Sequence, residues 1–483
     1  MNTVNLLFLF FTINAIVVAI FVILDNRSPT STIAWILLLT FFPVIGLLVY
    51  IFLGRTWKAF GRQRKLIKQV IGTEITAELA PLIAEHDENI EILCDKSPAY
   101  VRGLVEMAFR NSRSLLTTNN KLEILQNASE KYPCLLEDLS RAQHSIHMEY
   151  YIWGSDEFTE KIKTILIEKA RAGVEVRILY DAFGCFGVLS QSYKTELGQA
   201  GVEIHPYLFA FSMHNVAYRN HRKLVVIDGK IGYLGGLNLS QEHLDGGKHF
   251  DKWRDTHTRV IGEAARVLQG TFLVSWYNTT GKTIAEKNLF PAIEKTGNWT
   301  PIQIVSSGPD SRWEAIRQLY FSMITVAQHH IYLQSPFFIL DESMGEALKK
   351  AALAGVDVRV MIQPRGATWW SSLPYRAGYT YCEEMARAGV RIFLYETGYF
   401  HSKTISIDGE VCSIGTANMD IRSFSLNYEI NAVIYEPGIA KELEADFLKD
   451  QKECREFTFD AYQKENPLLR FYDSVARLAS PLI

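Results

Sequence analysis

The chain has 483 residues, which is enough for two or three domains with packed cores. Its formal net charge at pH 7 is only −3, so it lacks the global positive field that nucleic-acid-binding proteins often carry. The six cysteines are scattered, without a Cys-x-x-Cys pair or a ligand-like pairing with histidine. This pattern argues against a disulfide framework and against a zinc site, so we expect reduced thiols.

Two apolar stretches stand at the N-terminus, at about residues 4–24 and 33–53. Each would make roughly 31 Å of helix, enough to cross the hydrocarbon core of a bilayer. The first lacks the basic start and the cleavage site of a signal peptide, and Pro43 and Gly46 in the second are tolerated in membrane helices. We therefore predict a transmembrane hairpin within residues 1–58. A buried hairpin of a soluble protein is the alternative.

A cluster of basic residues follows the second stretch, with no acidic residue before Glu74. The positive-inside rule places such a cluster, and the rest of the chain with it, in the cytoplasm. The same charges could also hold anionic lipid headgroups at the membrane surface. We expect residues 59–96 to form a basic juxtamembrane linker and a helix. The cluster comprises Arg55, Lys58, Arg62, Arg64, Lys65 and Lys68.

From about residue 97 the sequence alternates between helical and strand patterns, and it does so twice. Gly173 and Gly355, for example, occupy matching places in two similar stretches. A repeat of about 180 residues is much longer than a solenoid unit and indicates a duplicated domain. Alternating βα units predict sheets covered by helices on both faces. We assign the two copies to residues 97–299 and 300–483.

Each copy contains the same motif: His-x-Lys, four residues, Asp, six residues, then Gly-(Gly/Thr)-x-Asn. An Asp-Gly pair between two apolar, β-branched runs predicts a hairpin with the aspartate at its turn. Residues i and i+2 of a strand share a face, so the histidine and the lysine should point the same way, toward a substrate. We count the histidines, lysines and aspartates of the motif as candidate catalytic residues. Among them, we expect the aspartates to act as turn and scaffold groups. The motif residues are His221, Lys223, Asp228 and Asn238 in the first copy, and His401, Lys403, Asp408 and Asn418 in the second.

A single site built from both motifs would contain two imidazoles and two ammonium groups. Such a site suits a phosphodiester, because lysines offset phosphate charge while one histidine attacks phosphorus and the other protonates the leaving oxygen. The two histidines must then hold opposite protonation states, as an imidazole pair near neutral pH can do. For either motif alone, a solvated strand face without a role is an equally good interpretation.

The paired motifs resemble the HKD motifs of the phospholipase D superfamily. More narrowly, the chain resembles the bacterial cardiolipin synthase family, and with the N-terminal membrane segment the resemblance covers nearly the whole length. It implies two phospholipase D-like α/β/α sandwich domains that face each other across one active site, preceded by the transmembrane hairpin. The stretches that carry the narrower resemblance are residues 147–153, 220–223, 253–257, 307–310 and 415–429.

The resemblance implies an activity: transfer of a phosphatidyl group between two phosphatidylglycerol molecules, giving cardiolipin and glycerol. His221 would be the nucleophile that forms a phosphohistidine, and His401 would protonate the departing glycerol; the reverse assignment stays open. Lys223, Lys403, Asn238 and Asn418 would hold the phosphoryl oxygens. The expected partners are phosphatidylglycerol and cardiolipin, with no cofactor, no metal and no nucleic acid. The expected location is the bacterial cell membrane, multi-pass, with the catalytic domains on the cytoplasmic side.

Two acidic residues, Asp255 and Glu429, follow the motifs at comparable distances. Each is a candidate for orienting a catalytic histidine through its far ring nitrogen, although either could instead pair with Arg254 or Arg422. The aromatic stretch 368–381 suits a membrane interface or an acyl-chain pocket, and equally a helix packed on the core. The tail, residues 467–483, reads as an amphipathic helix that lies on lipid or docks on the domain, and we favour docking.

Three alternatives to this function stay open at the level of sequence. The motifs equally suit a phospholipase D-type hydrolase or a headgroup exchanger, because acceptor choice depends on the shape and dryness of the pocket. A nucleic-acid phosphodiesterase is less compatible with two membrane segments and a near-neutral charge. From another class, the chain could be a catalytically silent membrane scaffold, against which the intact histidines and lysines of both motifs argue. Oligomeric state is beyond the sequence.

Overall fold

The computed structural model describes residues 3–24, 29–50, 75–207, 217–284, 287–311, 313–369, 371–478 and 480. The chain divides into two compact units, one containing the N-terminal helices and the other containing Leu66–Tyr207 and Arg219–Ile483. The predicted basic cluster at residues 55–68 lies outside the described residues. Each unit is considered by itself below.

The N-terminal unit consists of helices α1 (Thr3–Leu24), α2 (Pro29–Phe41) and α3 (Pro43–Val49), which contact one another. The first predicted apolar helix coincides with α1, but the second is not continuous as predicted. It begins earlier and breaks at Phe42 (φ −134°, ψ 65°), because the proline that follows restricts this residue and lacks an N–H group. Among the helices in the described ranges, none combines the length and the apolar character that a bilayer crossing requires.

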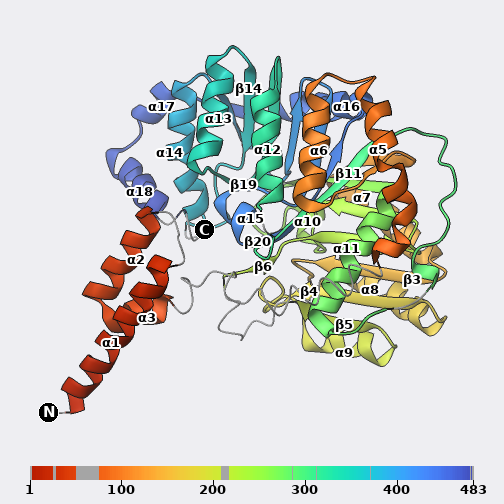
Figure 1. Cartoon of the computed structure of the whole chain (residues 1–483), viewed down its shortest axis with the longest axis horizontal. Helices are drawn as coiled ribbons and strands as arrows, with labels where there is room; N and C mark the ends of the chain where they lie inside the picture. Colours follow the sequence, from red (N-terminus) through yellow and green to blue (C-terminus); the bar gives the residue numbers. More distant parts are fainter. Residues whose placement is uncertain are drawn as a thin grey trace. The chain divides into compact units, whose positions relative to one another are not determined.

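The second unit contains two large mixed sheets (Figure 1). In the first sheet three strands run parallel, and the other neighbours pair antiparallel. Its order is β2 (Asn120–Gln126), β10 (Thr256–Gly262), β8 (Ile231–Gly235), β7 (Lys223–Ile227), β3 (Ser145–Tyr150), β4 (Glu175–Asp181) and β5 (Glu203–Tyr207).

Seven strands of the second sheet repeat this order and these directions, so the duplication predicted from sequence is present in the fold. They are β11 (Ile302–Ser307), β20 (Asn427–Ile434), β18 (Val411–Gly415), β17 (Thr404–Ile407), β12 (His330–Gln334), β14 (Asp357–Ile362) and β15 (Arg391–Tyr395). Three further strands extend this sheet: β1 (Leu116–Thr117), β21 (Cys454–Phe457) and β6 (Arg219–Asn220), of which β1 and β6 come from the first half of the chain.

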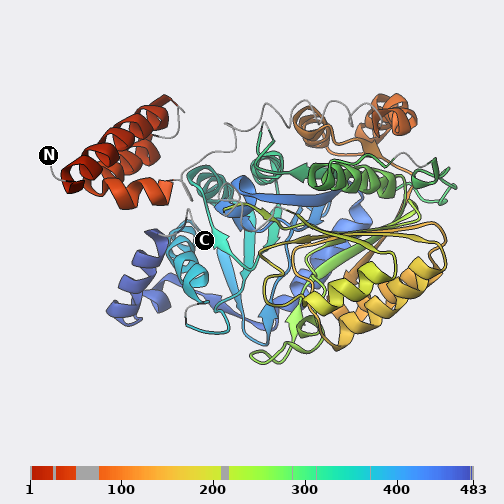
Figure 2. The ribbon, with the colours of Figure 1, turned by 90° about the horizontal axis from the view of Figure 1, so that it is seen from below.

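Helices cover both faces of the sheets, as predicted. Figure 2 shows the green helix α11 on one side of the first sheet and the gold and yellow helices on the other. The helices of the first half are α7 (Asn127–Arg141), α8 (Glu157–Arg171), α9 (Gln191–Gln199), α10 (Glu242–Asp245) and α11 (Glu263–Thr280). Those packed with the second sheet are α6 (Tyr100–Ser112), α12 (Ala315–Val326), α13 (Glu342–Leu353), α14 (Leu373–Arg387) and α16 (Pro437–Gln451), and α5 (Ala80–Cys94) and α15 (Ile421–Ser425) complete this set.

The C-terminal helix α18 (Pro467–Leu478), preceded by α17 (Phe459–Gln463), docks on α14, as we favoured from the sequence. Arg376 of α14 forms a bidentate pair with the buried carboxylate of Asp473. The tyrosines of the aromatic stretch are mainly buried in this packing, whereas Trp369 is exposed. The outer face of α18 carries exposed apolar side chains at Leu468, Phe471, Val475 and Leu478.

Candidate active site

Each motif forms the hairpin that its sequence predicts. Strands β7 and β8 are joined at Asp228 (φ 52°) and Gly229 (φ 63°), and β17 and β18 at Asp408 (φ 56°) and Gly409 (φ 67°). Positive φ at both central residues gives the turn a twist that matches the flanking strands, and an Asp-Gly pair tolerates it best.

The two aspartates stay at these turns and do not line the cavity that contains the histidines. The Asp228 carboxylate accepts from the backbone N–H groups of residues 143, 144 and 145 at 2.9, 2.7 and 2.9 Å. The Asp408 carboxylate accepts from residues 328, 329 and 330 at 2.9, 2.7 and 3.0 Å. Each aspartate thus ties the hairpin to the start of the neighbouring strand. This is the scaffold role, and it sets them apart from the other residues that we counted as catalytic candidates.

Two short strand pairs cross between the halves and place the catalytic groups. Strand β6, just before His221, pairs parallel with the start of β20, just before Glu429. Likewise β16 (Tyr399–Phe400), just before His401, pairs parallel with β9 (Trp253–Arg254), just before Asp255. The backbone N–H of His221 donates to Tyr428 O at 3.0 Å, and that of His401 donates to Arg254 O at 2.7 Å. The crossings therefore bring each histidine beside a carboxylate of the other half.

The histidine–carboxylate pairs are accordingly crossed. Nδ1 of His221 lies 3.0 Å from both carboxylate oxygens of Glu429, and Nδ1 of His401 lies 2.7 Å from Oδ2 of Asp255. All four side chains are buried. A carboxylate that accepts from Nδ1–H fixes the tautomer and leaves Nε2 as the nitrogen available for chemistry. The alternative partner of Asp255, Arg254, instead pairs with Asp450.

Both motif lysines are buried behind the histidines. Nζ of Lys223 donates to the backbone carbonyl of His221 at 2.7 Å, and Nζ of Lys403 donates to that of His401. Burial lowers the pKa of Lys223 to about 7, with Glu429 opposing and the Lys403 charge adding to the effect. Burial likewise lowers the pKa of Lys403 to about 8, opposed by the charges of Asp255 and Glu429. Burial thus brings the pKa values of both lysines close to neutral pH.

The histidines are driven toward the neutral form. Burial lowers the pKa of His221 to about 4, although the charge of Glu429 opposes it. Burial, Lys403 and Lys223 lower the pKa of His401 well below its usual value. Burial alone would raise the pKa of Glu429, but contact with His221 outweighs it and lowers this pKa. These shifts favour the neutral form of both rings before substrate binds, and the negative charge of a bound phosphodiester would favour protonation of one of them.

One cavity of about 290 Å³ brings the candidate residues of both halves together. His221, His401, Asn238 and Asn418 line it, whereas Lys223, Lys403, Asp255 and Glu429 lie behind them. Oδ1 of Asn238 accepts from Ile152 N at 3.2 Å, while Oδ1 of Asn418 is buried without a partner. The remaining wall consists of Tyr151, Ile152, Arg219, His243, Trp253, Phe337, Pro374, Tyr399, Asp420, Arg422 and Asn427.

Comparison with known proteins identifies the family. The family model described as "Cardiolipin synthase, PLD-like domain" matches residues 135–249 and 320–451, and the model "Phospholipase_D-nuclease N-terminal" matches residues 15–55. The cardiolipin synthase of Geobacillus sp. (strain WCH70) is 41% identical over 476 residues, covering 97% of this chain and 92% of that protein. The chain belongs to the cardiolipin synthase family of the phospholipase D superfamily.

Another member of the cardiolipin synthase family matches over almost its whole length. The cardiolipin synthase of Listeria monocytogenes serotype 4b (strain CLIP80459) is 38% identical over 490 residues, covering 99% of each chain. Among solved structures, the phosphatidylserine synthase of Haemophilus influenzae Rd KW20 superposes with a TM-score of 0.59 over 75% of this chain and 95% of that one. At 14% identity this likeness concerns the fold alone.

Sequence reasoning missed several cavity residues of this family member. Arg219 and Arg422 place two guanidinium groups in the wall, close enough that the charge of Arg422, after burial, lowers the pKa of Arg219. Trp253 and Tyr399 place aromatic rings 5.3 and 5.9 Å from the His401 ring. The signal that could have found these four residues is that each lies close to a motif or to a predicted carboxylate along the chain. Within the described part of the chain, no three His, Cys, Asp or Glu side chains are grouped to hold a metal ion.

Proposed function

We propose that the protein is a cardiolipin synthase that joins two phosphatidylglycerol molecules into cardiolipin and releases glycerol through a phosphohistidine. The observation that carries this proposal is the shared cavity: His221 and His401 line it together, each held at Nδ1 by a carboxylate of the opposite half. Two imidazoles at one phosphorus atom can serve as nucleophile and as acid, which transfer to a second alcohol requires.

In the first step neutral His221 attacks phosphorus through Nε2. The bond between phosphorus and the glycerol oxygen breaks, and His401, protonated in the presence of the anionic substrate, gives its proton to that oxygen. Glu429 keeps the Nδ1 proton of His221 engaged and stabilises the positive charge that the ring gains. Asn238 and Asn418 can donate to phosphoryl oxygens from the cavity wall, and Lys223 and Lys403 add positive charge from behind it.

In the second step the freed His401 takes the proton of a glycerol hydroxyl on a second phosphatidylglycerol. The oxygen of that hydroxyl attacks phosphorus, the bond from phosphorus to His221 breaks, and cardiolipin leaves. Every group returns to its starting state without a cofactor, and the reaction is reversible because it exchanges one phosphodiester bond for another. Water in place of the second lipid would give phosphatidic acid, which is the product of the alternative hydrolase.

The test is to supply the purified, reconstituted protein with phosphatidylglycerol alone and to identify the products. We expect cardiolipin and glycerol in equal amounts, and no product from a His221→Ala variant. Phosphatidic acid as the main product would support the hydrolase instead. A His221→Ala variant with full activity would support the scaffold.

We also propose that the N-terminal helices attach the enzyme to the bacterial cell membrane as a hairpin within residues 1–58, with α1 as one arm and the broken segment α2–α3 as the other, and with the phospholipase D-like domains at residues 97–299 and 300–483 on the cytoplasmic side. Exposed apolar side chains of α1, including Leu9, Phe10 and Ile13, support this attachment. Alkaline carbonate extraction of membranes tests the insertion, and labelling of single cysteines near Glu74 in intact cells tests the side. Release by carbonate, or labelling by an impermeant reagent, would contradict the corresponding part.

A further inference from the structure

A buried guanidinium stands behind each catalytic carboxylate. Nη1 of Arg254 donates to the backbone carbonyl of Asp255 at 2.7 Å, and Nε of Arg222 donates to that of Glu429 at 3.4 Å. The two arginines are only 5% and 7% exposed, and neither lines the cavity with the histidines. They belong to the motif stretches, yet the reaction described above makes no use of them.

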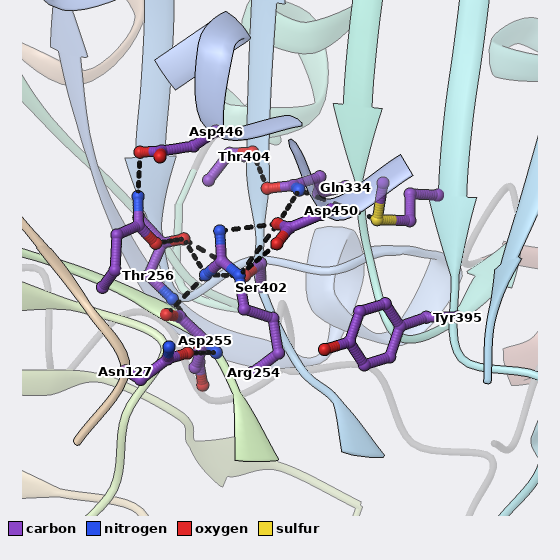
Figure 3. A network of polar contacts seen from close by, with 12 residues as sticks. Asn127, Arg254, Asp255, Thr256, Gln334, Tyr395, Ser402, Thr404, Asp446 and Asp450 are labelled. Carbon is purple, nitrogen blue, oxygen red and sulfur yellow. Dashed lines mark hydrogen bonds and ion pairs between the residues drawn. The ribbon is translucent and has the colours of Figure 1, made fainter. Parts of the chain in front are cut away.

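Arg254 joins the two halves of the chain (Figure 3). Its Nε lies 3.0 and 2.8 Å from the two oxygens of Asp450, and its Nη2 lies 2.7 Å from the nearer one. Its Nη1 also donates to Ser402 Oγ at 3.2 Å, directly after His401. Since the His401 N–H donates to the Arg254 carbonyl, side chain and backbone of this arginine both tie Asp255 to the histidine that it orients.

The other site reaches the same arrangement with exchanged residues. The position after the histidine is Arg222 in the first motif and Ser402 in the second, whereas the position before the carboxylate is Tyr428 for Glu429 and Arg254 for Asp255. The Arg222 guanidinium lies over the Tyr428 ring at 5.6 Å, as Arg254 lies against Ser402. In the His401 site the arginine directly precedes the carboxylate residue, whereas in the His221 site it directly follows the histidine. In both sites its guanidinium reaches the backbone carbonyl of the carboxylate residue.

The buried acids are exchanged in the same way. Glu149 of β3 accepts from Ser275 of α11 at 3.1 Å and lies 3.8 Å from Arg222. In the other half the matching strand position is Gln334 of β12, which donates to Asp450 of α16 at 3.1 Å. Each site therefore contains one buried arginine and one buried acid, from different positions of the repeat. The duplicated fold preserves the placement of the cation and not the residue that supplies it.

We propose that Arg254 and Arg222 are positioning residues of the transfer reaction, Arg254 for the Asp255–His401 pair and Arg222 for the Glu429–His221 pair. This inference rests on the proposed function. A guanidinium fork holds the carbonyl and an acid in fixed directions, which an ammonium group cannot do. Displacement of a catalytic group by about 1 Å costs on the order of 100-fold in rate, so loss of the fork should act on turnover.

The first experiment separates position from stability. Arg254→Lys retains the charge opposite Asp450 and loses the fork; we expect its kcat for cardiolipin formation to fall on the order of 100-fold while KM for phosphatidylglycerol changes little, because Arg254 does not touch the cavity. Arg317→Lys, in the bidentate Arg317–Asp341 pair outside the cavity wall, is the matched control and should retain its kcat. Thermal unfolding of both variants shows whether either pair matters to the fold.

A transposed variant tests the placement directly. Arg254→Tyr combined with Ser402→Arg gives the His401 site the order found in the His221 site. We expect this double variant to recover at least tenfold in kcat over Arg254→Tyr alone. No recovery in kcat, measured at a temperature where both variants are fully folded, overturns the inference.

A second donor identifies the step that each arginine serves. Phosphatidyl-p-nitrophenol releases p-nitrophenolate, which needs no proton, so it bypasses the acid role of His401. Arg254→Lys should then give a near-normal burst of p-nitrophenolate while remaining slow on phosphatidylglycerol, and Arg222→Lys should be slow on both. If instead Arg222→Lys gives the near-normal burst and Arg254→Lys is slow on both donors, positioning is still supported, but the roles of the two histidines are exchanged. Equal losses on both donors in both variants would overturn it, and a wild-type protein that forms no cardiolipin would instead refute the proposed function.

Discussion

At the scale of single residues, the central feature is that neither half of the protein contains a complete histidine–carboxylate pair. Glu429 of the second half contacts Nδ1 of His221, and Asp255 of the first contacts Nδ1 of His401, so we propose that each carboxylate orients the histidine of the opposite half. Burial lowers the pKa of both imidazoles and so favours the neutral form that the nucleophile needs. The acid has to acquire its proton in the presence of the phosphodiester anion.

The Glu429→Gln variant tests the orienting role. An amide in place of the carboxylate can present its NH₂ group to Nδ1, which favours the wrong tautomer and removes the charge that stabilises the imidazolium. A comparable change in a serine protease lowers kcat by about 10⁴-fold, so we expect a loss of roughly 10³- to 10⁴-fold in the initial rate of cardiolipin formation. Glu410→Gln, in the turn of the second hairpin, serves as the control. An unchanged rate in Glu429→Gln would contradict the role.

The pH dependence of kcat/KM should report the free enzyme. His221, with a pKa of about 4, must lose its proton to attack, so kcat/KM should rise as pH rises through about 4. Lys223 and Lys403, with pKa values of about 7 and 8, lose the charges that attract phosphate, so kcat/KM should fall as pH rises through this range. Initial rates at low concentrations of phosphatidyl-p-nitrophenol across pH 3 to 9 measure both limbs, because this donor does not need the proton of His401.

A Lys223→Arg variant provides the control for the alkaline limb. Arginine retains its charge throughout this range, so the fall should move toward the value of about 8 that belongs to Lys403. An alkaline limb that is identical in wild type and variant would assign it to another group.

At the scale of secondary structure elements, the hairpins hold the candidate catalytic residues in place, while their turns lie away from the cavity. Asp408 occupies a left-handed conformation and accepts three backbone hydrogen bonds that anchor the hairpin to β12. His401 and Lys403 lie at the other end of β17, just before it begins at Thr404 and next to the β16–β9 pair.

We therefore expect Asp408→Ala to act on stability rather than on catalysis. It loses the hydrogen bonds of a charged acceptor and places alanine at positive φ, so the free energy of unfolding should fall by about 2–4 kcal/mol. The kcat of the folded fraction should stay within about threefold of wild type, since no substrate contact is lost. Denaturant titration and initial rates, measured on one preparation, decide it. A 100-fold loss of kcat at unchanged stability would return Asp408 to the catalytic group.

At the scale of the whole molecule, the two halves are joined by more than a shared surface. Strands β1 and β6 of the first half belong to the sheet of the second, and the β9–β16 pair crosses as well. Arg254 of the first half binds Asp450 of the second (Figure 3), and Gln126 of the first half donates to Asp446 of the second. Neither half can form its active site while the other is unfolded.

This interdependence predicts a single cooperative unfolding transition for the residues that form the two sheets. We expect thermal unfolding followed by near-ultraviolet circular dichroism and the loss of cardiolipin synthesis to share one midpoint, because loss of either half removes a carboxylate from the other's histidine. Two resolved transitions, with activity lost in the first, would show that the halves fold independently. Arg254→Lys should lower this midpoint without splitting the transition.

The order of residues was enough to predict the duplication, the hairpins with aspartate at the turn, and the imidazole and ammonium groups of the site. These features depend on spacing and on local backbone preference, which the order of residues records. It failed at Phe42, where a proline breaks the second apolar helix, and it left the partners of Asp255 and Glu429 open. The crossed pairing, the burial that lowers the pKa of both histidines, and the arginines at the carboxylate residues became visible only in the folded chain. These depend on which segments lie side by side and on how completely they exclude water, and both arise from the packing of residues about 150 to 200 positions apart.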